Sequence, residues 1–169
     1  MLWMLFFYLQ GDRANVKILY GDRIGAQGVL NMGTSAIIYD ATHQKILLTR
    51  RSDNGRWCIP GGRMEVGESV SEACIREIHE ETGLQVKIKR LVGIYSSPHM
   101  LLEYADGNRY QVVNHSFEAE TTGGQLGLSD ETTEVGYFSP SEILQMDVLE
   151  HHLQRIQDAL ANQPLPVIQ

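Results

Sequence analysis

The segment 62–84, GRMEVGESVSEACIREIHEETGL, restricts the fold of this chain more than any other part of the sequence. Residues 69–82 contain no proline or glycine, and Ser69 is followed three residues later by Glu72, as in a capping box. Gly83 stands where a helix stop is expected. The pattern predicts a helix over residues 69–82.

Acidic residues fall on the apolar face of this predicted helix. At about 100° per residue, Glu77 and Glu81 share the face of the small and apolar residues, and Glu80 lies at its edge. A surface helix normally carries its glutamates opposite the apolar stripe. Carboxylates at these spacings also repel one another unless a positive charge lies between them. A bound cation therefore explains the pattern better than a surface helix that is merely rich in glutamate.

The carboxylates suit a hard divalent cation. Mg²⁺ prefers oxygen ligands and usually sits between one or two carboxylates and substrate phosphates. Zinc prefers nitrogen and sulfur ligands, but no second histidine or cysteine lies beside the helix, and His79 falls on its far side. We expect Mg²⁺, with Mn²⁺ as a substitute.

The order of residues in this segment resembles the Nudix box. Gly62, Glu68 six residues later and the run REIHEETGL at 76–84 match its fixed positions, and the likeness extends over about residues 30–160. The resemblance implies an α/β/α sandwich with a mixed β-sheet. It also implies metal-dependent hydrolysis of a pyrophosphate bond in a nucleoside diphosphate linked to another group.

The resemblance assigns roles within and just before the box. The metal ligands that it implies are Glu77, Glu80, Glu81 and the backbone carbonyl of Gly61. The supporting residues are Glu68 and Gly62, and Arg76 is placed to orient the carboxylates, as supporting groups do around metal sites. The expected catalytic set is Glu77, Glu80, Arg76 and Glu131.

The general base stays open between two positions. Family members use either a box glutamate or a glutamate on a loop before the last strand, and one carboxylate must take the proton of the attacking water. Glu131 in the segment LSDETTE resembles that loop glutamate, whereas Glu134 is expected to anchor the following strand.

The substrate is less clearly encoded than the reaction. The candidate phosphate contacts are Arg50, Arg51, Arg56 and Arg63, although a surface arginine usually does nothing specific. Pro98 lies fourteen residues past Leu84, close to a proline typical of ADP-ribose hydrolases. ADP-ribose or a related nucleotide sugar is the first choice. The alternatives are a nucleoside triphosphate pyrophosphohydrolase and a non-catalytic nucleotide-sensing module, which would usually lack box glutamates.

The chain length of 169 residues suits one domain, and the net charge of -7 argues against a general nucleic-acid binder. We expect an apolar and helical N-terminal arm at 1–29, a Nudix domain at 30–162 and a flexible tail at 163–169. The run MLWMLFFYLQ is too short to span a membrane and is expected to pack on the domain or on a partner subunit of a homodimer, with weak association with a membrane surface as the alternative. Cys58 and Cys74 are expected to be packing residues, and the location is expected to be cytoplasmic.

Several other elements follow from local patterns. Residues 34–40 and 45–50 are expected to form a hairpin or closely paired strands, and 57–59 a third strand. Residues 85–96 alternate as a strand, and 100–104 pair with 110–120 through an Asp-Gly turn. A last strand at 132–139 precedes a short helix and a final helix at 148–161. His151 and His152 on that helix are expected to be surface residues.

Overall fold

The structure, a computed structural model, describes residues 16–169. The expected apolar arm contact therefore lies mostly outside the described residues. The elements in chain order are β1 (Lys17–Tyr20), η1 (Ile24–Gln27), β2 (Val29–Ile38), β3 (Ile46–Arg51), β4 (Trp57–Cys58), α1 (Val70–Thr82), β5 (Leu84–Tyr95), β6 (Met100–Glu103), β7 (Arg109–Gly124), β8 (Thr132–Phe138), α2 (Pro140–Ile143), α3 (Glu150–Ala161) and β9 (Val167–Ile168).

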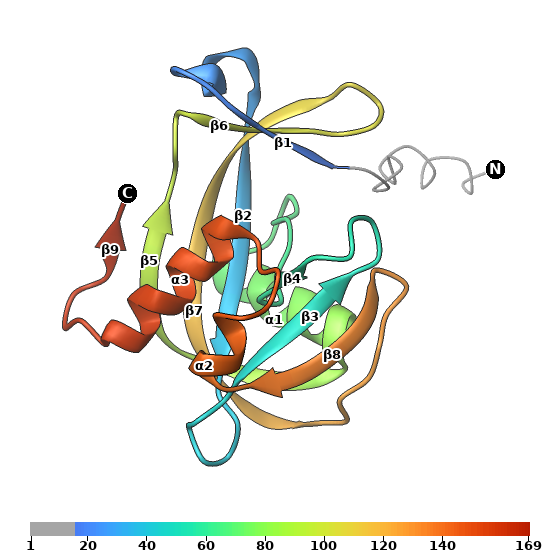
Figure 1. The fold of residues 1–169 in the computed structure, drawn as a ribbon, viewed down its shortest axis with the longest axis vertical. Helices are drawn as coiled ribbons and strands as arrows, with labels where there is room; N and C mark the ends of the chain where they lie inside the picture. Colours follow the sequence, from blue (N-terminus) through green and yellow to red (C-terminus); the bar gives the residue numbers. More distant parts are fainter. Residues whose placement is uncertain (1–15) are drawn as a thin grey trace.

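Two sheets lie between helices on opposite sides, with α3 in front and α1 behind in Figure 1. One sheet has the order β1-β6-β7-β5-β9, with β2 paired in parallel to β7, and the other has the order β4-β3-β8. Alternate side chains of β2 face the two helices: Ala36 and Ile38 join the core cluster of α1, whereas Ile37 joins that of α3. The last three residues of β2, Ala36 to Ile38, are therefore buried on both faces, in keeping with their aliphatic side chains.

The segments 34–40 and 45–50 do not form the expected hairpin. Strand β2 pairs with β7, whereas β3 pairs with β4 and β8 in the other sheet. Only an isolated bridge between Tyr39 and Ile46 joins the two strands. The intervening turn carries the chain from one sheet to the other, so closeness in sequence does not become pairing in space.

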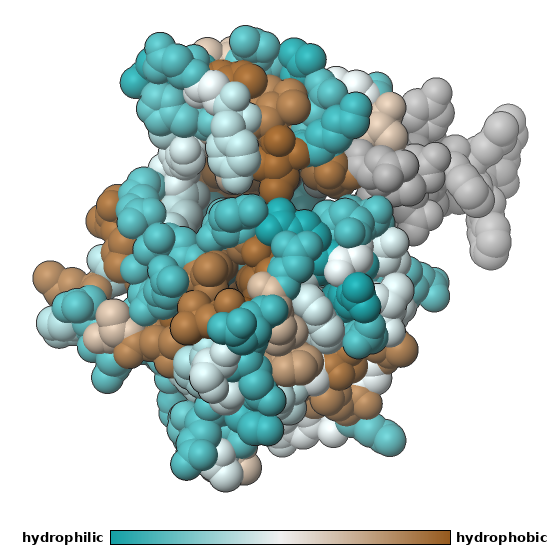
Figure 2. Space-filling view, in the orientation of Figure 1, coloured by the Kyte–Doolittle hydropathy of each residue, from teal (hydrophilic) through white to brown (hydrophobic). Residues whose placement is uncertain are grey.

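The hairpin of β6 and β7 is confirmed, with Leu102 opposite Tyr110 and Gly107 at a φ of 82° in the turn. Strand β1 pairs with β6, so residues 17–20 form a strand in place of the helical segment that we expected. At the other end, Val167 and Ile168 pair in parallel with β5 where we expected a loose tail. Figure 2 shows apolar side chains on the upper part of the molecule. Val29 and Leu30, at the start of β2, are exposed.

Helix α1 begins and ends where the sequence predicts. Ser69 accepts a hydrogen bond from the Glu72 backbone N–H, Glu72 reciprocates to complete a capping box, and Gly83 at a φ of 73° ends the helix. Cys58 and Cys74 are buried free thiols, as expected for packing residues. Among residues 16–169, none of the helices has the length and apolar character needed to cross a bilayer.

Candidate active site

The glycine loop before α1 is fixed to the edge of β2 by backbone hydrogen bonds. The Ala36 N–H donates to the Pro60 carbonyl at 3.0 Å, and the Thr34 N–H donates to the Gly62 carbonyl at 2.9 Å. Gly61 has a φ of 149°, and a Cβ there would overlap the Thr34 carbonyl. The close approach of loop and strand therefore requires glycine at position 61.

Gly62 gives Glu77 its place. A Cβ on Gly62 would overlap the carboxylate of Glu77, whose side chain belongs to α1 and is almost fully buried, with a residue exposure of 5%. The Glu77 carboxylate thus occupies the space that a side chain at position 62 would need.

We expect Gly62→Ala to lower kcat by about tenfold or more, because the added methyl must displace a carboxylate that supports the site. The fold should survive, since only one side chain has to move. Steady-state kinetics and a thermal melt check both parts, with Gly21→Ala as a comparison because a Cβ there makes only ordinary contacts, at 3.6 Å from Ile24. Wild-type kcat in Gly62→Ala would contradict the placement of Glu77 at the site.

Arg76 links the acids of the loop and the helix. Its guanidinium donates to both carboxylate oxygens of Glu68, at 2.6 and 2.9 Å, and to Glu77 and Glu80 at 3.0 Å each. It also donates to the Arg63 carbonyl at 3.0 Å. The hydrogen bonds from Arg76 hold the pKa of Glu68 at about 2. One arginine therefore fixes three carboxylates relative to one another.

Glu81 carries an unfavourable charge in this arrangement. Burial raises its pKa to about 8, against the Gly61 N–H that donates to it at 3.0 Å, and the negative charges of Glu77 and Glu131 add to the rise. Glu80, by contrast, is exposed. Three acids therefore share a region that favours an added positive charge.

The donor set fits a hard divalent cation by its chemistry. Within residues 16–169, no three acidic, histidine or cysteine side chains already form the geometry of a metal site. Instead, Arg76 holds Glu77 and Glu80, and the Gly61 N–H holds Glu81. Carboxylate oxygens are the ligands that Mg²⁺ prefers, and a cation would offset the repulsion that raises the Glu81 pKa.

Glu131 lies on a loop that is tied to the loop after β3. Its carbonyl accepts a hydrogen bond from the Ser52 N–H at 2.9 Å, and its charge acts on Glu81. The structure thus brings Glu131 near the box acids. Glu134 pairs instead with Arg50 across β8 and β3.

The four candidate arginines have different surroundings. Arg50 pairs with Glu134, and Arg51 binds both oxygens of Asp53 at 2.8 and 2.6 Å. Arg56 binds two acids at the start of α3, Asp147 at 2.9 Å and Glu150 at 2.8 Å. Arg63 lies over the ring of Tyr110, at 5.6 Å from its centroid. Arg56 is thus held at the start of α3, whereas Arg51 and Arg63 lie nearer the box acids. Neither Asp53 nor Tyr110 was a sequence candidate: the contact of Asp53 with Arg51 is local, between residues two positions apart, whereas that of Tyr110 with Arg63 depends on tertiary structure.

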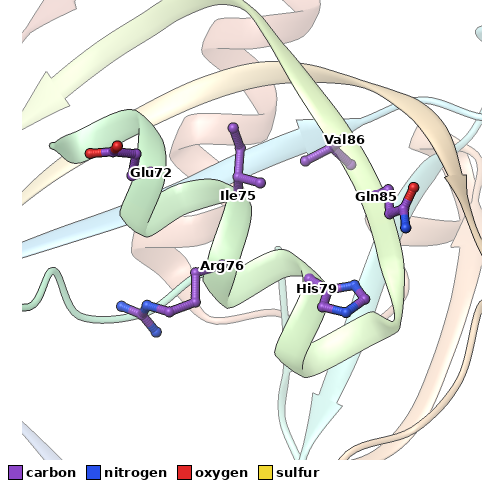
Figure 3. Close-up of a pocket in the computed structure, with 6 residues that line it drawn as sticks. All are labelled: Glu72, Ile75, Arg76, His79, Gln85 and Val86. Carbon is purple, nitrogen blue, oxygen red and sulfur yellow. The ribbon is translucent and has the colours of Figure 1, made fainter. Parts of the chain in front are cut away.

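His79 lies away from the acids, as its angular position predicts. Figure 3 shows it on the outer side of α1, pointing toward Gln85 on β5, whereas the Arg76 side chain points away from that strand. The pocket of about 370 Å³ at this place is lined mainly by apolar surface, including Ile75 and Val86. It lies on the opposite side of the helix from the buried Glu77.

Comparisons with known proteins agree with this geometry. A family model described as NUDIX domain matches residues 29–159. The chain is 42% identical over 97 residues to a Methanocaldococcus jannaschii protein named ADP-ribose pyrophosphatase, with 56% of this chain and 54% of that protein covered. It is 37% identical over 101 residues to a Bacillus subtilis protein provisionally named 8-oxo-dGTP diphosphatase, with 59% and 61% covered. The chain therefore spans about half to three fifths of the length of these relatives.

A solved structure extends the likeness to the fold. A NUDIX hydrolase from Nitrosomonas europaea is 27% identical, with a TM-score of 0.66 and with 82% of this chain and 93% of that chain covered. The likeness confirms the α/β/α sandwich with a mixed sheet that the sequence predicts.

Proposed function

Because the chain belongs to the Nudix family, we propose that it hydrolyses a pyrophosphate bond in a nucleoside diphosphate derivative, with ADP-ribose or a related nucleotide sugar as the first substrate candidate. The observation that carries this proposal is the convergence of Glu77 and Glu81 beside Gly61, with Arg76 holding the acids in order. The name of the Methanocaldococcus jannaschii relative supports the substrate.

The acids of the box would hold Mg²⁺ or Mn²⁺ through Glu77, Glu80, Glu81 and the Gly61 carbonyl. A bound divalent ion neutralises the diphosphate and lowers the pKa of water so that it can attack phosphorus near neutral pH. The chain's own part is to hold these oxygens in place through Arg76 and to accept the proton of the attacking water. Glu131 and a box glutamate are the two candidates for that acceptor.

We expect Glu131→Gln to lower kcat by about 10²-fold or more if Glu131 takes the proton, because glutamine keeps the shape of glutamate but not its basicity. The metal concentration for half-maximal activity should change little, which separates this variant from a ligand substitution. A kcat within a factor of about three of wild type would assign the proton to a box glutamate. Asp130→Asn on the same loop is the matched control.

A substrate panel with Mg²⁺ and Mn²⁺ tests the activity itself. ADP-ribose should yield AMP and ribose 5-phosphate, detected by phosphate release in a coupled phosphatase assay. A preference for nucleoside triphosphates, with release of pyrophosphate, would favour the second candidate, which the name of the Bacillus subtilis relative supports. Tight binding across the panel without turnover would favour a sensing module.

Domain limits, subunit contacts and location are further parts of the proposal. We place the catalytic domain at about residues 30–162, the arm of residues 1–29 in a homodimer contact and the protein in the cytoplasm. Removing residues 1–10 and measuring the mass in solution tests the contact. A truncated protein that stays dimeric, or a full chain that is monomeric, would reject it.

A further inference from the structure

Arg155 on α3 is a buried cation without an acidic partner. It is 4% exposed, and its Nε atom is buried without a hydrogen-bond partner within residues 16–169. The Arg155 guanidinium lies over the ring of Tyr95, at 5.4 Å from the centroid. The neighbouring acid Asp158 accepts a hydrogen bond from the Tyr95 hydroxyl and does not pair with Arg155. Burial lowers the Arg155 pKa to about 10, which leaves the side chain charged at neutral pH.

Two unpartnered imidazoles lie beside this cation. The rings of His151 and His152 are 4.5 Å apart, and the Nδ1 atom of each is buried with no hydrogen-bond partner in the described part of the chain. Both residues are partly exposed, as expected for the surface of a helix, but the buried Nδ1 atoms show that they are not plain surface residues. Burial lowers the pKa of His151 to about 3 and lowers the pKa of His152 well below its usual value, so both rings are neutral and each carries one N–H donor.

The start of α3 is fixed beside the strand that leads into the glycine loop. The Leu149 N–H donates to the Trp57 carbonyl at 3.0 Å, and the Trp57 N–H donates to the Asp147 carbonyl at 2.9 Å. Arg56 reinforces the joint through its ion pair with Glu150. Three residues link Trp57 on β4 to Gly61 of the glycine loop.

Arg51 connects the basic group with the acids electrostatically. Its charge acts on the pKa of both histidines, and the charge of Glu81 acts on the pKa of Arg51 itself. The basic group lies on α3, at the front of Figure 1, and the start of this helix is joined by backbone hydrogen bonds to the strand that leads into the glycine loop.

Burying a charge is costly unless an opposite charge or several hydrogen bonds compensate it. We propose that Arg155, flanked by His151 and His152, forms an anion subsite for a phosphoryl group next to the diphosphate site. Guanidinium and imidazole N–H groups are suited to phosphate oxygens. The assignment of that group to the substrate rests on the second candidate of the proposed function, because a nucleoside triphosphate has a third phosphoryl group and ADP-ribose lacks one.

Thermal melts with inorganic phosphate test the subsite without catalysis. Under chelating conditions the box acids repel anions, so binding should depend on the basic group. We expect tens of millimolar phosphate, compared with chloride at equal ionic strength, to raise the wild-type Tm by about 2 °C or more. Arg155→Met should lose this rise and, without phosphate, should melt no lower than wild type, because it removes an uncompensated buried charge.

Two further variants make the result specific. Arg90→Met is the matched control, since Arg90 already pairs with Glu118 on the sheet, and it should keep the phosphate response. Arg155→Lys should keep only part of the response, because an ammonium lacks the planar fork of the guanidinium. No phosphate response in wild type, or an undiminished response in the Arg155 variants, would overturn the subsite even if the enzyme is active.

Kinetics then identify the source of the phosphoryl group. If it belongs to the substrate, Arg155→Lys should raise KM for a nucleoside triphosphate by about tenfold and leave KM for ADP-ribose nearly unchanged. An unchanged KM for both substrates, with the phosphate response lost, would assign the subsite to free phosphate. Failure of the proposed hydrolase activity would leave the thermal test intact.

Discussion

Glu81→Gln is expected to lower kcat by about 10²–10⁴-fold while the fold is retained. The glutamine fills the same space beside Gly61, but it removes the negative charge that would attract the divalent ion. Glu80→Gln should act in the same direction through the exposed acid of the group. Steady-state rates over a range of Mg²⁺ concentrations measure the loss.

The same substitution is expected to stabilise the metal-free protein. In the unfolded chain Glu81 titrates near the ordinary glutamate value, whereas in the folded chain burial raises its pKa to about 8. The folded state therefore binds the proton more strongly, and wild type loses stability relative to Glu81→Gln as pH rises from about 4.5 to about 8. With EDTA present, the Tm difference should be small at pH 5 and largest at pH 8 or above.

Glu65→Gln is the control for both measurements, because Glu65 is an exposed loop residue outside the proposed ligand set. It should leave kcat and the pH dependence of Tm close to wild type. A Glu81→Gln variant with wild-type kcat at all Mg²⁺ concentrations would end the assignment of this acid to the metal site.

Arg76→Ala is expected to cost about 10–100-fold in kcat and to lower Tm. The substitution leaves Glu77 buried without the guanidinium that compensates it and releases Glu68 from its paired hydrogen bonds. Loss of a partner from a buried charge destabilises more than loss of a surface ion pair. Kinetics at saturating Mg²⁺ separate this effect on geometry from weakened metal binding.

Arg76→Lys separates the charge of Arg76 from the planar geometry of its guanidinium. An ammonium cannot donate to both oxygens of Glu68 and also reach the two helix acids and the Arg63 carbonyl with the planar geometry of a guanidinium. We therefore expect little rescue of kcat, although the charge is kept. Full rescue by lysine would mean that Arg76 acts through charge alone.

Local patterns in the sequence predict the parts of the fold that are stabilised locally. The capping box at Ser69, the stop at Gly83 and the turn at Gly107 each depend on residues a few positions apart. The position of Glu77 on the apolar side of α1 follows from helical periodicity for the same reason.

The errors all concern contacts between distant segments. The pairing of β2 with β7, rather than with β3, depends on residues far along the chain, and so does the pairing of β9 with β5. The burial of Arg155 and of the His151 Nδ1 atom depends on the distant segments that pack over the start of α3. A single sequence shows the composition of that helix but not the surface that covers it.

The pairing of β2 with β7 also sets when the site can assemble during synthesis. The segment 62–84 is complete long before β7 leaves the ribosome, yet its glycine loop is fixed to β2, and β2 faces a strand 81 residues further on, as the contact of Ser35 with Ser116 shows. Closing such a long loop is slow. The nascent chain therefore carries a finished catalytic sequence with no framework to hold it, and activity should first appear only after β7 has emerged.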